Sequence, residues 1–450
     1  MIFSRLSRAA RILLAAVTLS CFAQTAHAEG QPVETFALKN GMHVILIPNH
    51  RLPIVTHMLF YRVGSADDFT GKSGLAHYNE HMMFQGTQQV PAGVFARTMT
   101  GNGGEFNAFT ERDFTAYYVS IAKEHLPLVM KLEADRMLHL APTPANFAKE
   151  REVIIEERRM SVENQPEALL GEALTAMLFR NSPYHNPVIG WMHEMQSLTR
   201  EDVLAFHKRF YNPADALLVV SGDVTRKDLE PLAQQYYGSL PRGEENIRHW
   251  RTEPPQRGAR HMVMHHRNVK QPELVRMYMA PSVSGEEKQL LIPSFLVGQI
   301  VGGGQTSLLY QQLVVKQKLA TGIDASYDGL SQGPGIFTIH ATPAPGITLQ
   351  QLETAVDKEI EAYLEHGNDA ADLTRAKILL KADTVFARDG SEGMARLLGT
   401  LVMEGLPVEY FNQWPDIVAN VKDAEVMKTA KAIFNPDDSV TGYLLPQEGK

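Results

Sequence analysis

Two histidines and a glutamate lie close together in the run Gly74-Leu75-Ala76-His77-Tyr78-Asn79-Glu80-His81-Met82. His77 and His81 are four residues apart, and Glu80 precedes the second histidine. Residues three or four apart share one face of an α-helix, so both imidazoles can bind one metal ion. The carboxylate of Glu80, one turn from His77, can reach a water molecule beside that metal. The run therefore predicts a metal centre that activates water for hydrolysis.

The third ligand of such a centre must come from another part of the chain. A catalytic zinc site has three protein ligands and one position open for water. The best candidate segment is a charged helix at 149–160, in which Glu150 and Glu157 lie seven residues apart and therefore share a face. Cys21 is the only cysteine and lies near the N-terminus, so no thiolate ligand is expected in the mature chain. Imidazole and carboxylate ligands favour one zinc ion per chain.

Residues 1–28 have the pattern of a secretory signal peptide. Three arginines precede an apolar stretch at 12–23, and small residues at 26–28 fit a cleavage site after Ala28. The apolar stretch is shorter than the roughly 20 residues that span a bilayer, so we expect no membrane span. Cys21 leaves a lipoprotein signal as an alternative, but Thr18 fits the lipobox poorly. Export and an expected zinc site together indicate a periplasmic protein.

Length and composition indicate a soluble protein with more than one domain. The chain has 450 residues, of which 44% are hydrophobic and 21% are charged. Its formal net charge of -8 argues against a nucleic-acid partner, which usually requires a basic face. Residues 241–258 are rich in Pro, Gly, Arg and Glu and lack periodicity. They predict a linker between a catalytic domain at 29–240, which follows the signal peptide, and a second domain at 259–450 without a metal site.

Strand and helix patterns follow one another in both halves of the chain. The first half shows hairpins at 35–47 and 105–121, strands at 54–63 and 216–220, and helices at 125–141, 144–163, 166–180, 199–211 and 225–237. The second half shows strands at 274–279, 321–329, 335–342 and 440–445, and helices at 285–301, 306–318, 348–366 and 369–388. This mixture predicts an α+β fold. We expect two homologous α/β-sandwich domains, each an antiparallel-rich sheet packed with helices, that face each other across a cleft.

The metal-binding run and its surroundings resemble a known family. The His-x-x-Glu-His run, followed by Glu157 in a Glu-Arg-x-Val-Ile-x-x-Glu setting, is similar to the motif of the inverzincins of the pitrilysin/insulysin family. The most similar branch is the β subunit of the mitochondrial processing peptidase and its bacterial relatives. The resemblance implies that His77, His81 and Glu157 bind zinc and that Glu80 is the general base. It also implies that Glu150 is a supporting catalytic acid that orients a ligand histidine.

The run at 103–110 resembles the substrate-binding edge strand of the same family. The resemblance implies that Asn107 and Ala108 hold the backbone of a peptide that adds to the sheet as an extra strand. An ordinary hairpin with glycines in its loop is the alternative explanation of this run. Binding by strand addition requires an extended substrate, so unfolded peptides are the expected substrates.

The second half lacks two residues that the resemblance leads us to expect. Family members carry an arginine and, seven residues later, a tyrosine, which hold the substrate carbonyl and stabilise its negative charge. Val314 and Thr321 occupy these positions here, and no arginine occurs between Arg276 and Arg375. We therefore expect the zinc-bearing subunit of a heterodimer, whose homologous partner lacks the zinc motif and supplies the arginine and tyrosine. The alternatives are a self-sufficient homodimeric zinc peptidase and a non-catalytic assembly subunit of the same fold.

Overall fold

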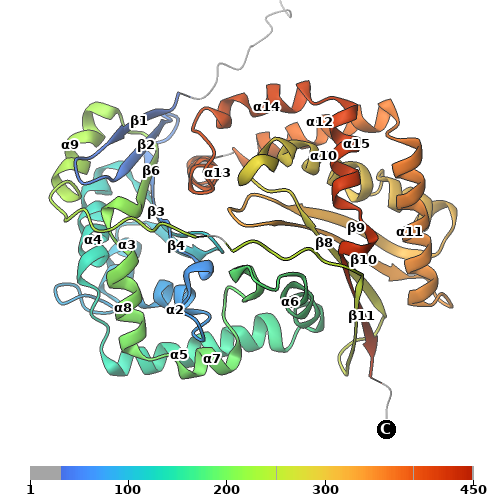
Figure 1. Ribbon diagram of the computed structural model, residues 1–450. Helices are drawn as coiled ribbons and strands as arrows, with labels where there is room; N and C mark the ends of the chain where they lie inside the picture. Colours follow the sequence, from blue (N-terminus) through green and yellow to red (C-terminus); the bar gives the residue numbers. More distant parts are fainter. Residues whose placement is uncertain (1–31, 250, 389, 448–450) are drawn as a thin grey trace, which may run out of the picture. The chain divides into compact units, whose positions relative to one another are not determined.

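The computed structural model describes residues 32–249, 251–388 and 390–447. Val33–Lys450 forms one compact unit, in which two mixed β-sheets, one from each half of the chain, pack with helices (Figure 1). The expected signal peptide at 1–28 lies outside the described residues. Among the described helices, none combines the length and the apolar character that a membrane crossing requires.

The first sheet has the strand order β1-β2-β6-β3-β5-β4. Its strands are β1 (Glu34–Ala37), β2 (His43–Pro48), β3 (Ile54–Tyr61), β4 (Glu105–Thr110), β5 (Thr115–Ala122) and β6 (Ala216–Gly222). The strands β2 and β6 are parallel, and all other neighbours are antiparallel. Both predicted hairpins are confirmed, as β1–β2 and β4–β5. The strand β4 lies at the edge of the sheet, where a further strand can pair with it.

The second sheet repeats the topology of the first except for β1, which has no counterpart among its described strands. Its strands are β7 (Arg260–His266), β8 (Glu273–Ala280), β9 (Ala320–Asp328), β10 (Gly335–Pro343) and β11 (Ser439–Pro446), in the order β7-β11-β8-β10-β9. In the first sheet β6 lies parallel to β2, and in the second sheet β11 lies parallel to β7. The hairpins β4–β5 and β9–β10 form one edge of each sheet. The predicted α+β fold with two similar halves is confirmed. The prediction omitted β7, because the consecutive apolar residues Met262–Met264 conceal its alternation.

The helices of the first half carry the candidate site. They are α2 (Leu75–Met82), α3 (Val94–Gly101), α4 (Leu126–His139), α5 (Pro144–Arg158), α6 (Pro166–Leu178), α7 (Met192–Ser197), α8 (Arg200–Phe210) and α9 (Arg226–Tyr236). Among them, α2, α3 and α4 contact the first sheet. A short π-helix, η3 (Arg159–Glu163), joins α5 to α6. The prediction at 144–163 therefore covers α5 and η3 together, and the short helices α3 and α7 were not predicted.

The second half contains three more helices than its sequence predicted. Its helical segments are η6 (Gly285–Leu290), α10 (Leu291–Gly302), the π-helix η7 (Tyr310–Lys316), α11 (Leu349–His366), α12 (Ala370–Ala387), α13 (Gly390–Met403), α14 (Tyr410–Asn420) and α15 (Asp423–Ile433). The helices α13, α14 and α15 were not predicted. Glycines within α13 and Pro415 within α14 interrupt the helical pattern of this segment.

Each half contributes one helix to the sheet of the other half (Figure 1). The helix α13 packs on β3 and β6, and α6 packs on β8 and β11. The α13 contact buries one apolar cluster, which includes Ile45, Ile47, Met58, Phe60, Leu217, Val219, Met394, Leu398 and Leu401. The α6 contact buries another, which includes Leu170, Leu174, Leu178, Val275, Met277, Val440 and Leu444. At these two places helices fill the space between the halves, where the sequence predicted a cleft.

The segment at 241–258 connects the halves, and its described residues form neither helix nor strand. Arg248 within it is nearly buried and contacts both halves. Its Nε donates to Asp67 at 2.9 Å, and its Nη1 donates to Asp113 at 3.0 Å and to Gln332 at 3.3 Å. The connection is therefore fixed to the core at this arginine.

Candidate metal centre

The helix that carries both histidines, α2, begins where two glycines pack against each other. Gly74 precedes α2 with a φ of 82°, and a Cβ atom there would lie 2.5 Å from the carbonyl oxygen of Ile189. Gly190, with a φ of 85°, makes the reciprocal contact. Asp68 caps the helix, because its two carboxylate oxygens accept hydrogen bonds from the N–H groups of Gly74 and Ala76, both at 2.7 Å. The start of α2 is thus fixed against the loop that contains Gly190.

The structure brings the three expected metal ligands, His77, His81 and Glu157, together. One ligand atom of each lies within 4.8 Å of those of the other two. The Nε2 of His77 is 3.7 Å from one carboxylate oxygen of Glu157, and the Nε2 of His81 is 3.3 Å from the other. Ligand atoms at ordinary zinc bond lengths lie about 3.3 Å apart around a tetrahedral ion. Two imidazoles and one carboxylate in this geometry fit a zinc ion.

Glu150 forms a hydrogen bond with His81 through the ring nitrogen that faces away from the other two ligands. The Nδ1 of His81 donates to Glu150 at 2.9 Å, and the amide of Gln85 donates to the other carboxylate oxygen at 2.7 Å. This contact turns the Nε2 of His81 toward His77 and Glu157. Glu150 therefore lies where an orienting residue is expected, and outside the ligand set itself.

The pKa values of the two ligand histidines are shifted in opposite directions. Burial, together with neighbouring His81, lowers the pKa of His77 to about 4. Burial also opposes protonation of His81, but the carboxylates of Glu150 and Glu157 outweigh it and raise its pKa to about 9. In the metal-free protein His81 is therefore protonated at neutral pH. A cation that binds here must displace this proton, so metal affinity should increase with pH.

Glu80 lies beside the ligand set on the same helix. It is 9% exposed, and one of its oxygens accepts a hydrogen bond from the hydroxyl of Thr110 at 2.6 Å. Burial raises the pKa of Glu80, although the Thr110 contact opposes the shift. Thr110 was not among the site residues predicted from the sequence. The available signal was its position on the edge strand two residues after Ala108, which places both side chains on one face.

A cavity of about 520 Å³ lies beside these groups. It is lined by His77, Glu80, Ala108, Phe109, Thr110, Glu157, Ser161, Val162, Ala168, Glu172, Pro187, Val188 and Ile189, all from the first half. Ala108 is thus at the cavity. Asn107 is next to it on the exposed edge of β4, and its side-chain oxygen accepts the N–H of Ala108 at 2.9 Å.

The second-half positions where the family has an arginine and a tyrosine do not reach this cavity. Val314, on η7, packs against the core of the second half, and Thr321 is exposed on β9. Among the described residues that line the cavity there is neither an arginine nor a tyrosine. Within the described chain, the metal ligands are therefore assembled without the arginine and tyrosine expected to stabilise the negative charge on the substrate carbonyl.

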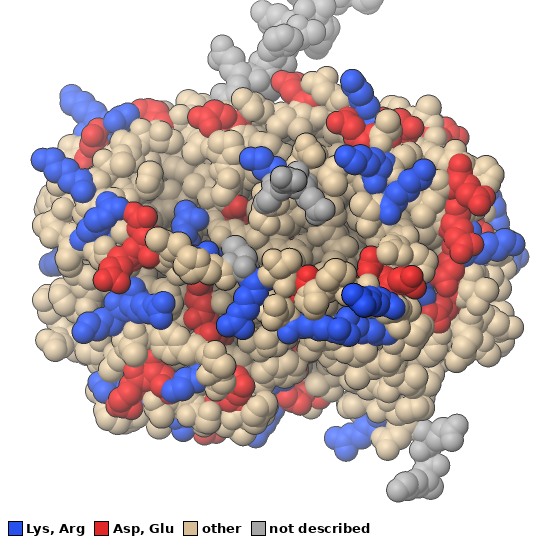
Figure 2. Space-filling model, in the orientation of Figure 1, with Lys and Arg blue, Asp and Glu red and all other residues tan. Residues whose placement is uncertain are grey.

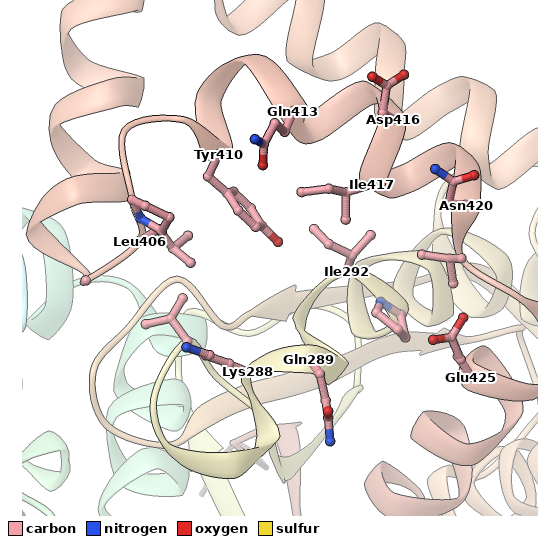
Figure 3. A pocket seen from close by; sticks show the side chains of 15 residues that line it. Lys288, Gln289, Ile292, Leu406, Tyr410, Gln413, Asp416, Ile417, Asn420 and Glu425 are labelled. Carbon is pink, nitrogen blue, oxygen red and sulfur yellow. The ribbon is translucent and has the colours of Figure 1, made fainter.

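A larger cavity, of about 730 Å³, lies in the second half between α10 and α14 (Figure 3). Its charged lining residues do not converge on one point. Lys288 and Glu425 lie on opposite sides of it, and the carboxylate of Asp416 points away. This cavity presents no cluster comparable with the three metal ligands, so the first-half cavity is the better candidate for chemistry.

Acidic and basic side chains are interspersed on the face shown in Figure 2. Basic side chains form no continuous stripe across the described residues of that face. Nucleic acids bind along extended basic surfaces, because each phosphate carries a negative charge. This face does not have that character.

Two family models match most of the chain. The model described as insulinase (peptidase family M16) matches residues 43–191, and the model described as the peptidase M16 inactive domain matches residues 197–380. All residues of the candidate metal centre lie within the first match. The division between the two models agrees with a metal site in the first half alone.

Comparison with individual proteins and solved structures agrees with these family models. Zinc protease PqqE of Helicobacter pylori is 29% identical over 420 residues, which cover 92% of this chain and 93% of that protein. The crystal structure of a protease from Helicobacter pylori matches with a TM-score of 0.83 at 27% identity, over 92% of this chain and 100% of that one. The periplasmic protease PqqL from Escherichia coli has the same fold, with a TM-score of 0.77 at 20% identity, over 93% of this chain and 48% of that one. The paired family models, with zinc protease relatives that match over nearly their whole length, show that this chain belongs to the insulinase family of peptidases, M16.

Proposed function

We propose that this protein is a zinc-dependent endopeptidase that hydrolyses unfolded peptides. The observation that carries the proposal is the convergence of His77, His81 and Glu157 within 4.8 Å, beside the buried carboxylate of Glu80. Relatives named zinc proteases support the choice of metal and of reaction. One such cluster among the described residues corresponds to one zinc ion per chain.

The chain's own residues provide the proton transfers. When bound, a zinc ion makes a water molecule more acidic and polarises a peptide carbonyl. Glu80 is placed to accept the proton of the attacking water and to deliver it to the leaving amine. Thr110 engages one oxygen of Glu80, so the other oxygen is the one placed for proton transfer. Burial raises the pKa of this carboxyl and so makes it a stronger base.

The edge strand β4 is the proposed binding surface for the substrate. It is open to pairing on one side, and Ala108 and Thr110 on this strand line the cavity. A peptide that pairs with β4 passes directly beside Glu80. Asn107 now accepts the N–H of Ala108, and a substrate carbonyl would replace that contact. A folded protein cannot present its backbone in this way, so unfolded peptides are the proposed substrates.

A second, homologous chain is proposed to complete the site. The cavity lining lacks an arginine and a tyrosine among the described residues, and acyl-transfer chemistry gains strongly from such groups. A partner of the same fold could supply both from its own second half. PqqL of Escherichia coli is about twice as long as the part that this chain matches, so it has room for a second unit. The alternative is a homodimer in which other residues replace the pair.

The periplasm is the proposed location. The pattern of residues 1–28 supports it, because basic, apolar and small residues follow one another as in a secretory signal. The relative PqqL carries the word periplasmic in its description. Metal sites that use no cysteine suit an oxidising compartment.

Hydrolysis of an unfolded peptide by the purified, zinc-loaded chain tests the proposal, with Glu80→Gln as the blank. Glu80→Gln should retain about one zinc per chain but lose activity by a factor of roughly 10² to 10⁴, because only proton transfer is removed. Activity that survives this substitution would refute the role of Glu80. Activity of the isolated wild-type chain would favour the homodimer. Full zinc content without activity would favour the partner, and a failure to bind zinc would favour the non-catalytic subunit.

A further inference from the structure

Arg158, the residue after the ligand Glu157, has a fully engaged and buried side chain. It is 2% exposed. Its Nε donates to Glu163 at 3.0 Å, and its two terminal nitrogens donate to the two carboxylate oxygens of Glu172, both at 2.9 Å. One of them also donates to the carbonyl oxygen of Gly190 at 2.6 Å. This guanidinium therefore joins the end of α5, the π-helix η3, the helix α6 and a loop.

The bond to Gly190 reaches the other ligand-bearing helix. Gly190 packs directly against Gly74, where α2 begins, so closely that a Cβ atom on Gly190 would lie 2.6 Å from the Cα of Gly74. The helix α2 carries His77 and His81. Arg158 is thus tied to the element that holds two ligands and is itself adjacent to the third.

The position of the Glu157 carboxylate depends on where the backbone at the end of α5 lies. Its side chain is 44% exposed, and the ion pairs it makes are with the two ligand histidines. It lies at the end of α5, where the regular helix changes to the wider turns of η3. The hydroxyl of Ser161 accompanies this change by donating to the carbonyl oxygen of Glu157 at 2.8 Å. An anchor for the end of α5 is therefore needed to place this carboxylate opposite the histidines.

Arg158 also pairs with a second carboxylate, Glu172, near the candidate ligands. Glu172 lines the same cavity as His77 and Glu157. The bidentate contact with Arg158 engages both of its oxygens. Without this contact, Glu172 would be an unpaired, partly buried negative charge beside the ligands.

We propose that Arg158 is a positioning residue that sets the distance between Glu157 and the two ligand histidines and thereby the zinc affinity of the site. The inference rests on the proposed zinc function and extends it to a residue that does not touch the metal. Groups that orient metal ligands from outside typically change affinity by 10–100-fold when they are removed.

The test compares zinc affinity in Arg158→Met with that of the wild-type protein, by competition with a fluorescent chelator at a temperature where both are folded. We expect at least tenfold weaker binding. Arg276→Met is the control for lost stability, because Arg276 is also buried and pairs with Glu353 and Asp357 in the second half. It should lower the unfolding temperature and leave zinc affinity unchanged. Arg159→Met, at the exposed neighbouring position, should change neither.

A double variant separates positioning from charge. In Arg158→Met/Glu172→Gln the unpaired carboxylate is removed, so stability should partly recover while zinc binding stays weak. Zinc affinity in Arg158→Met within twofold of wild type, or an equal loss in Arg276→Met, would overturn the inference. A wild-type protein that binds no zinc would instead overturn the proposed function, so the two failures are distinguishable.

Discussion

At the scale of single residues, the contact between Thr110 and Glu80 links the substrate strand to the proton-transfer group. The hydroxyl of Thr110 donates to the Glu80 carboxylate at 2.6 Å, and its backbone belongs to β4. A peptide that pairs with β4 would therefore lie beside the residue that orients the base. The proposed binding and proton-transfer functions meet at this one side chain.

Replacement of Thr110 by valine should lower kcat without changing zinc content. Hydrogen bonds to charged groups contribute about 1.5–3 kcal/mol, which corresponds to a loss of roughly 10- to 100-fold in kcat if Glu80 loses its orientation. Steady-state kinetics and metal analysis of Thr110→Val provide the measurement. Thr110→Ser keeps the hydroxyl and should remain within a few-fold of wild type. Equal losses in both variants would show that shape, rather than the hydrogen bond, matters at this position.

Residues close in sequence could be predicted better than residues brought together by the fold. His77, Glu80 and His81 were accessible because helical geometry alone places them on adjacent turns. Glu157 is distant along the chain, and the resemblance to a family was needed to select it. Arg158 had no local signal, because its contacts with Glu172 and Gly190 depend on how three separate elements pack.

At the scale of elements, the exchange of α6 and α13 between the halves is the main packing feature. Gly399 of α13 lies against Phe60 of β3 so closely that a Cβ atom there would be 2.1 Å from the ring. At Gly171 of α6, by contrast, a Cβ atom would meet no heavy atom within 4 Å apart from its chain neighbours and its own helix backbone. Two glycines in comparable helices thus differ in whether an added methyl group has space.

Gly399→Ala should destabilise the protein and Gly171→Ala should stabilise it. Overpacking of a core typically costs 1–3 kcal/mol, because the helix must move away from the sheet. Alanine in place of an unconstrained helical glycine gains about 0.5–1 kcal/mol. Thermal unfolding of the two variants beside wild type measures both effects. A Gly399→Ala variant at least as stable as wild type would contradict the close packing of α13 on β3.

Helix α13 also shows why part of the fold escaped prediction. The helix could not be predicted from the segment itself, because Gly393 and Gly399 lower its helix propensity. Packing against the first sheet stabilises the helix in spite of these glycines. Most strands, in contrast, were predicted from their own residues, although their order in each sheet was not. The sequence therefore indicated the sheets more clearly than the helix that joins them.

At the scale of the whole molecule, the halves meet around the buried carboxylate of Asp113. It accepts hydrogen bonds from Arg248 of the connecting segment, Tyr184 of the first half and the backbone of Gln332 in the second half. Glu404, which follows α13, is 4% exposed and shares a side-chain hydrogen bond with Asp113. Burial, and then the charge of Asp113, raises the pKa of Glu404 to about 10.

Glu404→Gln should stabilise the protein at neutral and alkaline pH. Glu404 is protonated in the folded chain but ionised above pH 4.5 in the unfolded chain. Its contribution to stability is therefore fully present below pH 4.5 and is lost as the pH rises toward 10, by at most about 3 kcal/mol near pH 7. Glutamine has no proton to lose. Unfolding temperatures at pH 5, 7 and 9 should show a gain over wild type that grows with pH.

The matched control for this prediction is Glu409→Gln, at an exposed position directly before α14. That substitution should leave the pH dependence of the unfolding temperature unchanged. A pH-independent difference between Glu404→Gln and wild type would show that Glu404 is already ionised in the folded protein.

The exchanged helices also determine the order in which a newly made chain can fold. The face of the first sheet that includes Met58 and Phe60 is covered by residues 390–403, so it stays open until nearly the whole chain has been synthesised. Contacts between such distant residues form slowly, and open apolar sheet faces aggregate. Nascent chains of this protein therefore need protection during that interval, and a chain that ends before α13 would expose the apolar face permanently.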